Sequence, residues 1–327
     1  MTRATGIGSW PGTDLREALR VVRDLLAGEG IPYLPEAPAR GPGADLIGRS
    51  AGLLVDLHVD LQPSGWRFVD RPGRDAERAS SFWRQDLDDL AEVFDGYQGE
   101  LKLAVAGPWT LASGIHLHRG ERVLADEGAT RDLVESLAEG IRRHLADVQR
   151  LVPGASLVLQ VDEPSLPAVL AGRLPTSSGY GHLRPVDPQV ATTGLQQVLA
   201  AAGKSDTVVH CCDPAIPLPL LRATGAGAIA LDTTDLGPAR WESLAATVEA
   251  GTNVYAGCLP TDGSGITARA WRQVAQAWQR TGLPLSGLGD IVVSPACGLA
   301  GLTPSEATSV QRMAVEVAKE LSERAES

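Results

Sequence analysis

Short runs of apolar, mostly β-branched residues alternate along the chain with longer segments whose apolar residues recur at helical spacing. The short runs predict strands at residues 5–10, 32–35, 101–106, 156–161, 207–212, 228–231, 252–257 and 290–294. The longer segments predict helices at residues 14–27, 130–151, 188–202, 238–250, 268–280 and 304–323. Strands that alternate with helices are typical of a parallel sheet covered by helices.

Eight predicted strands favour an α/β fold of one closed (β/α)8 TIM barrel, which needs about 250 residues before insertions. An open doubly wound sheet is the alternative, but Gly6 and Gly8 lack the third glycine of a dinucleotide-binding loop. We expect a single catalytic domain over residues 1–327. An irregular insertion rich in Gly, Pro and Arg is expected around residues 36–80, with a hairpin at residues 63–66.

Composition narrows the class of protein. Hydrophobic residues make up 43% of the 327 residues, which is enough to bury a large core and excludes a disordered chain. The formal net charge of −11 argues against nucleic-acid and membrane partners, because both need basic patches. The first residues lack the apolar core of a signal peptide, so we expect a cytoplasmic protein whose 4 cysteines stay reduced.

Candidate metal ligands follow the ends of three predicted strands. His210 and Cys212 share one side of a strand, whereas Cys211 faces the other side. Asp232 and Cys297 come at the ends of later strands, and in a barrel these ends meet on one face. Together the four side chains make a tetrahedral Zn²⁺ set, or three ligands with one exchangeable position. The alternative is that one thiol and one imidazole are simply packed in the core.

Other polar residues suit an amino-acid substrate. Asp162 and Glu163 follow the strand at 156–161, where a carboxylate is placed to bind an ammonium group. Alternatively, Asp162 caps a turn and Glu163 is solvated. Gly8 and Ser9 offer a backbone N–H and a hydroxyl to a substrate carboxylate, or else form an ordinary strand-to-helix turn.

Five short motifs, taken together, resemble the catalytic domain of cobalamin-independent methionine synthase. They are Ile7-Gly8-Ser9, Gly107-Pro108-Trp109-Thr110-Leu111, Gln160-Val161-Asp162-Glu163-Pro164, His210-Cys211-Cys212 and Ser294-Pro295-Ala296-Cys297-Gly298-Leu299. The motifs run in the family's order from the first predicted strand to the last. The resemblance implies a TIM barrel with Zn²⁺ held by His210, Cys212 and Cys297. Asp232 stands where the family has a glutamate as the fourth ligand.

The resemblance also implies an activity: transfer of a methyl group to the thiol of homocysteine, which forms methionine. Homocysteine is then expected to bind the turn formed by Ile7, Gly8 and Ser9. Asp162 would bind its ammonium, with Asp56 as a second carboxylate. Asp162 and Glu163 are the candidate catalytic groups.

Two departures from the family concern the methyl donor. The family's histidine after the seventh strand is missing, and Cys258 lies close to its place. The familiar enzyme has two barrels, whereas this chain has one barrel and only 3 lysines for a polyglutamate tail: Lys102, Lys204 and Lys319. A methyltetrahydrofolate-type donor is favoured, with a methyl-corrinoid as the competing donor.

Three other functions remain open at this stage. One is a corrinoid-dependent or coenzyme M-type zinc thiol alkyltransferase, which would need cationic groups for a sulfonate. Another is a metal-free decarboxylase barrel, against which the positions of His210, Cys212 and Cys297 argue. The third is a non-catalytic protein that still binds zinc or substrate.

Overall fold

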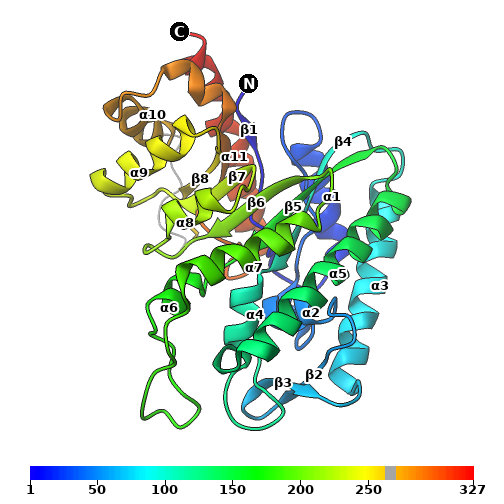
Figure 1. Ribbon diagram of the computed structural model, residues 1–327. Coiled ribbons are helices and arrows are strands. Elements are labelled where there is room, and N and C mark those ends of the chain that lie inside the picture. Colours follow the sequence, from blue (N-terminus) through cyan, green and yellow to red (C-terminus); the bar gives the residue numbers. More distant parts are fainter. Residues whose placement is uncertain (262–269) are drawn as a thin grey trace.

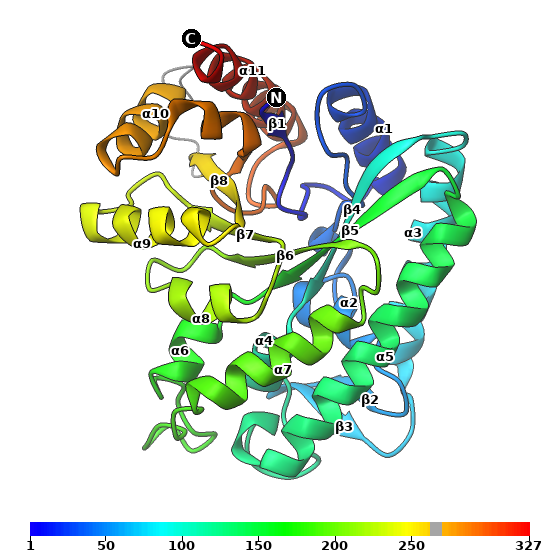
Figure 2. The same ribbon diagram turned by 45° about the horizontal axis from the view of Figure 1, so that its top comes forward.

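Seven parallel strands curve into the wall of a barrel, and the helices cover its outside (Figures 1 and 2). The computed structural model describes residues 1–261 and 270–327. The strands lie in the order β1-β9-β8-β7-β6-β5-β4. Their bounds are Arg3–Ala4 (β1), Gly99–Ala106 (β4), Ala155–Asp162 (β5), Asp206–Cys211 (β6), Ala228–Asp232 (β7), Asn253–Leu259 (β8) and Val292–Pro295 (β9). All carboxyl ends therefore open on the same end of the barrel.

Residues 30–36 close the barrel between β1 and β4, although they form no regular strand. The Ile31 amide donates to the Ala4 carbonyl, and the Lys102 amide donates to the Pro32 carbonyl, each at 2.8 Å. A proline has no N–H to donate, so this segment bonds as isolated bridges instead of a ladder. The predicted TIM barrel is thus confirmed over an open doubly wound sheet.

The first predicted strand is displaced. Its regular ladder spans Arg3–Ala4 instead of residues 5–10, and Gly6, just beyond it, packs against the Tyr33 ring. A Cβ at Gly6 would lie 2.4 Å from that ring. The strands predicted from residue 101 onward are confirmed, with ends within two residues of the prediction.

The six predicted helices are confirmed, except that residues 268–269 lie outside the described residues. Asp14 caps α1 by accepting from the Glu17 amide at 3.0 Å, and Thr303 and Glu306 form a capping box at α11. No helix in the described ranges has the length and apolarity to cross a membrane. The helices are α1 (Leu15–Leu26), α2 (Leu46–Ala51), α3 (Arg74–Val93), α4 (Pro108–Gly114), α5 (Glu127–Leu151), α6 (Leu166–Leu170), α7 (Pro188–Ala200), α8 (Leu218–Ala223), α9 (Pro238–Glu249), α10 (Ala270–Arg280) and α11 (Pro304–Ala325), with 3₁₀ turns Pro38–Arg40, Val123–Ala125 and Leu285–Asp290.

The long helix α3 was not predicted. Its buried stripe contains Ala79, Trp83, Asp86 and Leu90, at helical spacing. A buried carboxylate interrupts the apolar pattern, so the periodic signal in the sequence is weak at this helix.

The hairpin predicted at residues 63–66 is present. Strands β2 (His58–Gln62) and β3 (Gly65–Val69) pair in antiparallel fashion around a two-residue turn. The Phe68 amide donates to the His116 carbonyl at 2.8 Å, which ties the hairpin to the chain after α4 (Figure 1).

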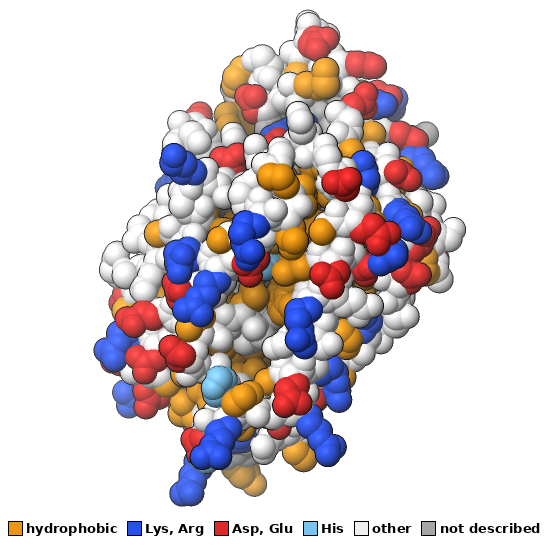
Figure 3. Space-filling view, turned by 90° about the vertical axis from the view of Figure 1, so that its right-hand side faces the viewer, with side chains coloured by type: hydrophobic (Ala, Val, Ile, Leu, Met, Phe, Trp, Pro, Cys, Tyr) orange, Lys and Arg blue, Asp and Glu red, His pale blue; other side chains and the backbone are white. Residues whose placement is uncertain are grey.

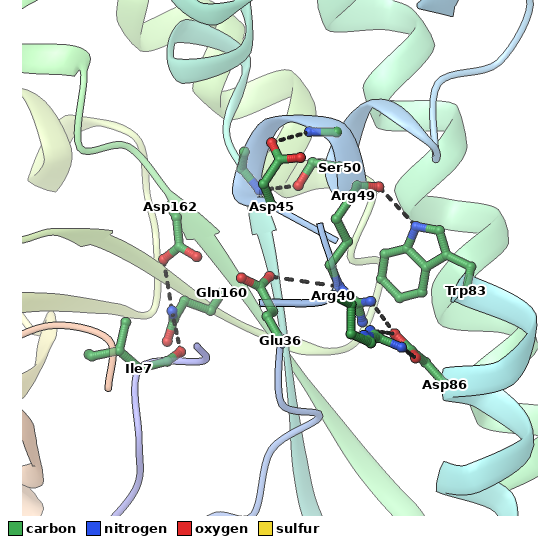
Figure 4. Close-up of polar contacts among 12 residues, drawn as sticks. Ile7, Glu36, Arg40, Asp45, Arg49, Ser50, Trp83, Asp86, Gln160 and Asp162 are labelled. Carbon is green, nitrogen blue, oxygen red and sulfur yellow. Dashed lines mark hydrogen bonds and ion pairs between the residues drawn. The ribbon is translucent and has the colours of Figure 1, made fainter. Parts of the chain in front are cut away.

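A buried ion cluster joins α2 and α3 to the barrel. Asp86 accepts from both terminal nitrogens of Arg40, at 2.6 and 3.0 Å, and pairs with Arg49. The Arg49 guanidinium also lies 3.7 Å from the centre of the Trp83 ring (Figure 4). A carboxylate that pairs with two buried cations is costly to remove, because both cations then lose their partner.

We predict that Asp86→Asn lowers the free energy of unfolding by about 3–5 kcal/mol, since it removes the negative charge that both buried guanidinium groups share. The matched control is Glu139→Gln, which breaks solvent-screened surface pairs with Arg142 and Arg143 and should change stability far less. Urea unfolding of both variants measures the difference. Equal losses would contradict a dominant role for the buried cluster.

Candidate active site

Polar side chains lie at the carboxyl ends of three neighbouring strands of the barrel. Asp162 ends β5 and pairs in register with His210, near the end of β6. Asp232 ends β7, in register with Gly257 of β8. The side chains of Asp162, His210 and Asp232 lie on the side of their strands that faces the barrel interior. Val208, Ala228 and Ala230 lie below them on the same side.

Two sulfur atoms lie next to His210. Cys212 directly follows β6, Cys297 follows β9, and their Sγ atoms are 3.3 Å apart. The hydrogen bond between them lowers the pKa of the Cys297 thiol to about 6 against the effect of its burial, and it raises that of Cys212. The positive charge that His210 carries when protonated lowers the pKa of Cys297 further. The thiol of Cys297 is therefore prone to ionise.

Of the two ring nitrogens of His210, one has a hydrogen-bond partner in the described residues. Its Nδ1 lies 2.8 Å from Asp162 Oδ1, whereas its buried Nε2 has no hydrogen-bond partner in the described ranges. An imidazole nitrogen and two thiol sulfurs are ligand types that Zn²⁺ prefers. The chemistry of these three side chains therefore suits zinc.

Asp232 is held differently from these three. Its Oδ1 accepts from the Thr234 amide at 2.8 Å and from the Thr234 hydroxyl at 2.6 Å. Across residues 1–261 and 270–327, no three His, Cys, Asp or Glu side chains are assembled as a complete metal-binding group. Ligation of zinc by His210, Cys212, Cys297 and Asp232 stays a prediction, and Asp232 would have to leave Thr234 to take part.

The turn formed by Ile7, Gly8 and Ser9 lies against the loop that carries Cys297. The Leu299 amide donates to the Ser9 carbonyl at 3.0 Å. A Cβ at Gly298 would lie 2.0 Å from Ser9 Oγ, so only glycine permits this contact without movement of Ser9. The predicted turn and the predicted sulfur ligand are therefore neighbours.

Glu36 belongs to the site, and the sequence prediction missed it. Its amide donates to the Gly8 carbonyl at 3.1 Å, and its own carbonyl accepts from the Trp10 amide at 2.7 Å. The side chain is only 6% exposed and lies between Arg49 and Asp162 (Figure 4). Burial raises the pKa of Glu36 to about 7, although the charge of Arg49 opposes this. Glu36 follows a predicted strand directly, so the strand-end rule that identified Asp162 would also have identified Glu36.

Asp56 lies elsewhere. It lines a groove of about 690 Å³ between the hairpin, α3 and α5, whose walls include Leu53, Trp83 and His144. Figure 3 shows this face, with hydrophobic side chains in the hollow and basic side chains beside it. None of the other predicted substrate-binding residues lines this groove. Substrate binding by Asp56 stays a prediction, and Glu36 is better placed as the second carboxylate.

Glu163 is bound to α4. It accepts from the Trp109 amide at 2.9 Å, and from the Thr110 amide and hydroxyl at 2.8 and 2.7 Å. Burial raises its pKa to about 7 despite these bonds. A Cβ at Gly107 would lie 2.4 Å from the Glu163 carboxylate. This geometry favours a structural role at the start of α4, and a catalytic role for Glu163 stays a prediction.

Comparisons with known proteins identify the family. The profile described as cobalamin-independent synthase, catalytic domain, matches residues 101–320. A B12-independent methionine synthase from Shewanella sp. W3-18-1, solved with selenomethionine, is similar in fold, with a TM-score of 0.64 and 13% identity. That match covers 99% of this chain and 98% of the other.

Other solved structures are more distant. A 2,3-dimethylmalate lyase of the PEP mutase/isocitrate lyase superfamily has a TM-score of 0.40 and 12% identity, over 96% of this chain and 83% of the other. A GH5_18 protein from Streptomyces cattleya has a TM-score of 0.49 and 17% identity, over 98% and 80%. No curated protein sequence matches the chain. The family profile spans more than half of the chain, so the protein belongs to the cobalamin-independent methionine synthase family and is a methyltransferase that acts on homocysteine.

Proposed function

We propose that the chain uses zinc to transfer a methyl group from a methyltetrahydrofolate-type donor to the thiol of homocysteine, which yields methionine. One observation carries the proposal. His210, whose Nε2 has no hydrogen-bond partner in the described residues, bonds Asp162, and the charges of both act on Cys297 of the sulfur pair. Asp162 in turn lies close enough to Glu36 to raise its pKa. This arrangement would put a thiol-activating centre next to an ammonium site.

His210, Cys212 and Cys297 would hold the metal, with Asp232 as the fourth ligand. A bound Zn²⁺ supplies the charge that keeps a substrate thiol deprotonated at neutral pH, where a free thiol with a pKa near 8.5 is mostly protonated. The 2.8 Å contact with Asp162 orients the His210 ring, as partners of metal-binding histidines generally do.

Glu36 and Asp162 would bind the ammonium of homocysteine. Their negative charges are close enough that Asp162 raises the pKa of Glu36. A substrate cation between two buried carboxylates relieves that repulsion. The Ser9 hydroxyl and the N–H groups of Gly8 and Ser9 would receive the substrate carboxylate, which puts the thiol toward Cys297.

A methyl-corrinoid is the second candidate donor, and Cys258 favours it. Cys258 lies close to the place of the family's missing histidine, and burial raises the pKa of its thiol to about 12. Such a thiol keeps its proton at neutral pH and is a poor acid for a folate leaving group. A cobalt leaving group needs no proton.

The metal assignment predicts that Cys297→Ser loses stoichiometric zinc binding at neutral pH, because a hydroxyl does not supply an anionic sulfur. Metal analysis of the purified protein measures the loss. The matched control is Cys211→Ala, since Cys211 is fully buried on the side of β6 that faces the helices. Full zinc occupancy in Cys297→Ser would refute the assignment.

The acceptor site predicts that Glu36→Gln weakens homocysteine binding roughly tenfold or more, since a charge-assisted hydrogen bond contributes about 1.5–3 kcal/mol and ~1.4 kcal/mol is a factor of ten. Zinc content should not change, because Glu36 has no contact with the proposed ligands in the described part of the chain. Calorimetry that gives equal affinities would exclude Glu36 from the acceptor site.

The raised pKa of Glu36 predicts that the KM for homocysteine depends on pH. Because the pKa of Glu36 is about 7, its carboxylate form prevails above that pH and its neutral form below it. The KM for homocysteine should therefore rise as the pH falls from about 8 to about 6. In Glu36→Gln the KM should be high and nearly flat over this range. A wild-type profile that is flat as well would contradict the assignment.

Varying the number of glutamates on the folate tests how the methyl donor is bound. Lys102 is buried, so only Lys204 and Lys319 offer lysine charge at the surface. We therefore expect monoglutamyl and triglutamyl donors to give similar KM values in steady-state kinetics. A strong preference for the triglutamate would contradict this expectation. Activity with methylcobalamin alone would replace folate by the corrinoid donor.

A further inference from the structure

A lysine lies inside the barrel, directly below the candidate acceptor site. Lys102 is fully buried on β4, and its Nζ lies 5.4 Å from the centre of the Tyr33 ring. The Nζ donates to the Ile7 carbonyl at 2.9 Å and to Gln160 Oε1. The charges of Asp162 and Glu36 both raise the pKa of Lys102, which burial lowers to about 7. Lys102 therefore faces both carboxylates of the site.

The contacts of Lys102 determine how the Gln160 amide is oriented. Both partners of Nζ are oxygens that accept hydrogen bonds, so Nζ donates to both whether it is an ammonium or an amine. The Gln160 oxygen thus points to Lys102, and its NH₂ group points the other way. That group donates to the Ile7 carbonyl and to Asp162 Oδ1, each at 2.8 Å (Figure 4).

The chain of hydrogen bonds continues from Gln160 through Asp162 to His210. The carboxylate of Asp162 accepts hydrogen bonds only, so Nδ1 of His210 must carry the proton in their 2.8 Å contact. The neutral ring then has a bare lone pair on Nε2, the buried atom without a partner in the described residues. This is the tautomer that binds a metal through Nε2.

We infer that Lys102 is a positioning residue: it fixes the Ile7 carbonyl both directly and through Gln160, and by orienting Gln160 it aims Asp162, which sets the tautomer of His210. The inference rests on the proposed function of this site. It joins the two halves of that site, because one hydrogen-bonded chain runs from the substrate turn to the proposed metal ligand.

A purely structural role is the competing explanation. An apolar side chain of similar volume fills such a space without the cost of burying a charge. If Lys102 only filled space in the core, Gln160 could be replaced by any group that accepts a hydrogen bond from the Lys102 ammonium, with no effect on homocysteine binding. The two explanations therefore differ in what they predict for Gln160.

Two variants separate the explanations. Gln160→Glu keeps an oxygen toward Lys102 and adds an ion pair, but it removes the donors to Ile7 and Asp162 and sets one carboxylate against another. We expect homocysteine binding to weaken roughly tenfold or more in Lys102→Met and in Gln160→Glu, the loss of about one charge-assisted hydrogen bond. In steady-state kinetics the KM should change more than kcat.

The matched control is Lys319→Met. Lys319 is an exposed residue whose Nζ pairs with Glu29 at 3.0 Å, so its removal should leave homocysteine affinity unchanged. Calorimetry gives the affinities, and thermal unfolding checks that each variant is folded.

The tautomer of His210 is a readout that needs no turnover. Nitrogen-15 spectra of the metal-free wild type should show the His210 proton on Nδ1, with the signal assigned by its loss in His210→Ala. In Gln160→Glu the ring should lose this single tautomer. A wild-type proton on Nε2 would overturn the inference even if Lys102→Met does not fold.

The outcomes distinguish the two proposals. If the wild type does not bind homocysteine, the proposed function fails. If the wild type binds homocysteine, and Gln160→Glu binds it equally well with an unchanged tautomer, then the function stands and the role of Lys102 is wrong.

Discussion

The hydrogen bonds that join residues 30–36 to β1 and β4 close the barrel, and the candidate site depends on that closure. In the regular ladder, β1 and β4 are the two edges of the sheet and lie six strand positions apart. Closure brings the edges together, so that Lys102 of β4 reaches the carbonyl of Ile7 just beyond β1. It also places Glu36 beside the Gly8–Ser9 backbone and opposite Asp162. An open sheet would leave these groups on separate edges.

The closing segment is held by polar groups that are costly to bury. Arg49 pairs with Asp86 on one side and lies 3.9 Å from Glu36 on the other. Both Glu36 Oε1 and Arg49 Nε lack a hydrogen-bond partner among the described atoms. Buried ion pairs add little net stability compared with apolar packing, so stability alone does not explain this arrangement. The arrangement does account for the position of the Glu36 carboxylate at the candidate acceptor site.

Much of the fold and part of the site followed from strand ends in the sequence. Asp162, His210, Cys212 and Cys297 were identified as candidates because a parallel barrel brings its carboxyl ends to one face. Glu36 was missed because its strand is short and rich in proline, so residue 36 was assigned to the following insertion.

Other features depend on contacts that a linear pattern does not contain. Helix α3 was missed because buried Asp86 takes an apolar position of its stripe, and the arginines that pair with it are about 40 residues away. The bond of Asp232 to Thr234 and the bonds of Glu163 to α4 are likewise decided by local side-chain geometry. Strand ends therefore predict where a residue lies better than what it contacts.

The formal charges around the acceptor site bear on the class of acceptor. Four carboxylates and three basic side chains are buried in mutual contact or close range: Glu36, Asp86, Asp162 and Glu163, with Lys102, Arg40 and Arg49. Carboxylates outnumber the basic groups, so an acceptor that brings an ammonium group adds a favourable counter-charge. A thiol that carries a sulfonate brings one negative charge, and each cation of this group already faces a carboxylate. Because an uncompensated buried charge costs several kcal/mol, on the order of 3–5 kcal/mol for a broken pair, this balance favours homocysteine over a coenzyme M-type acceptor.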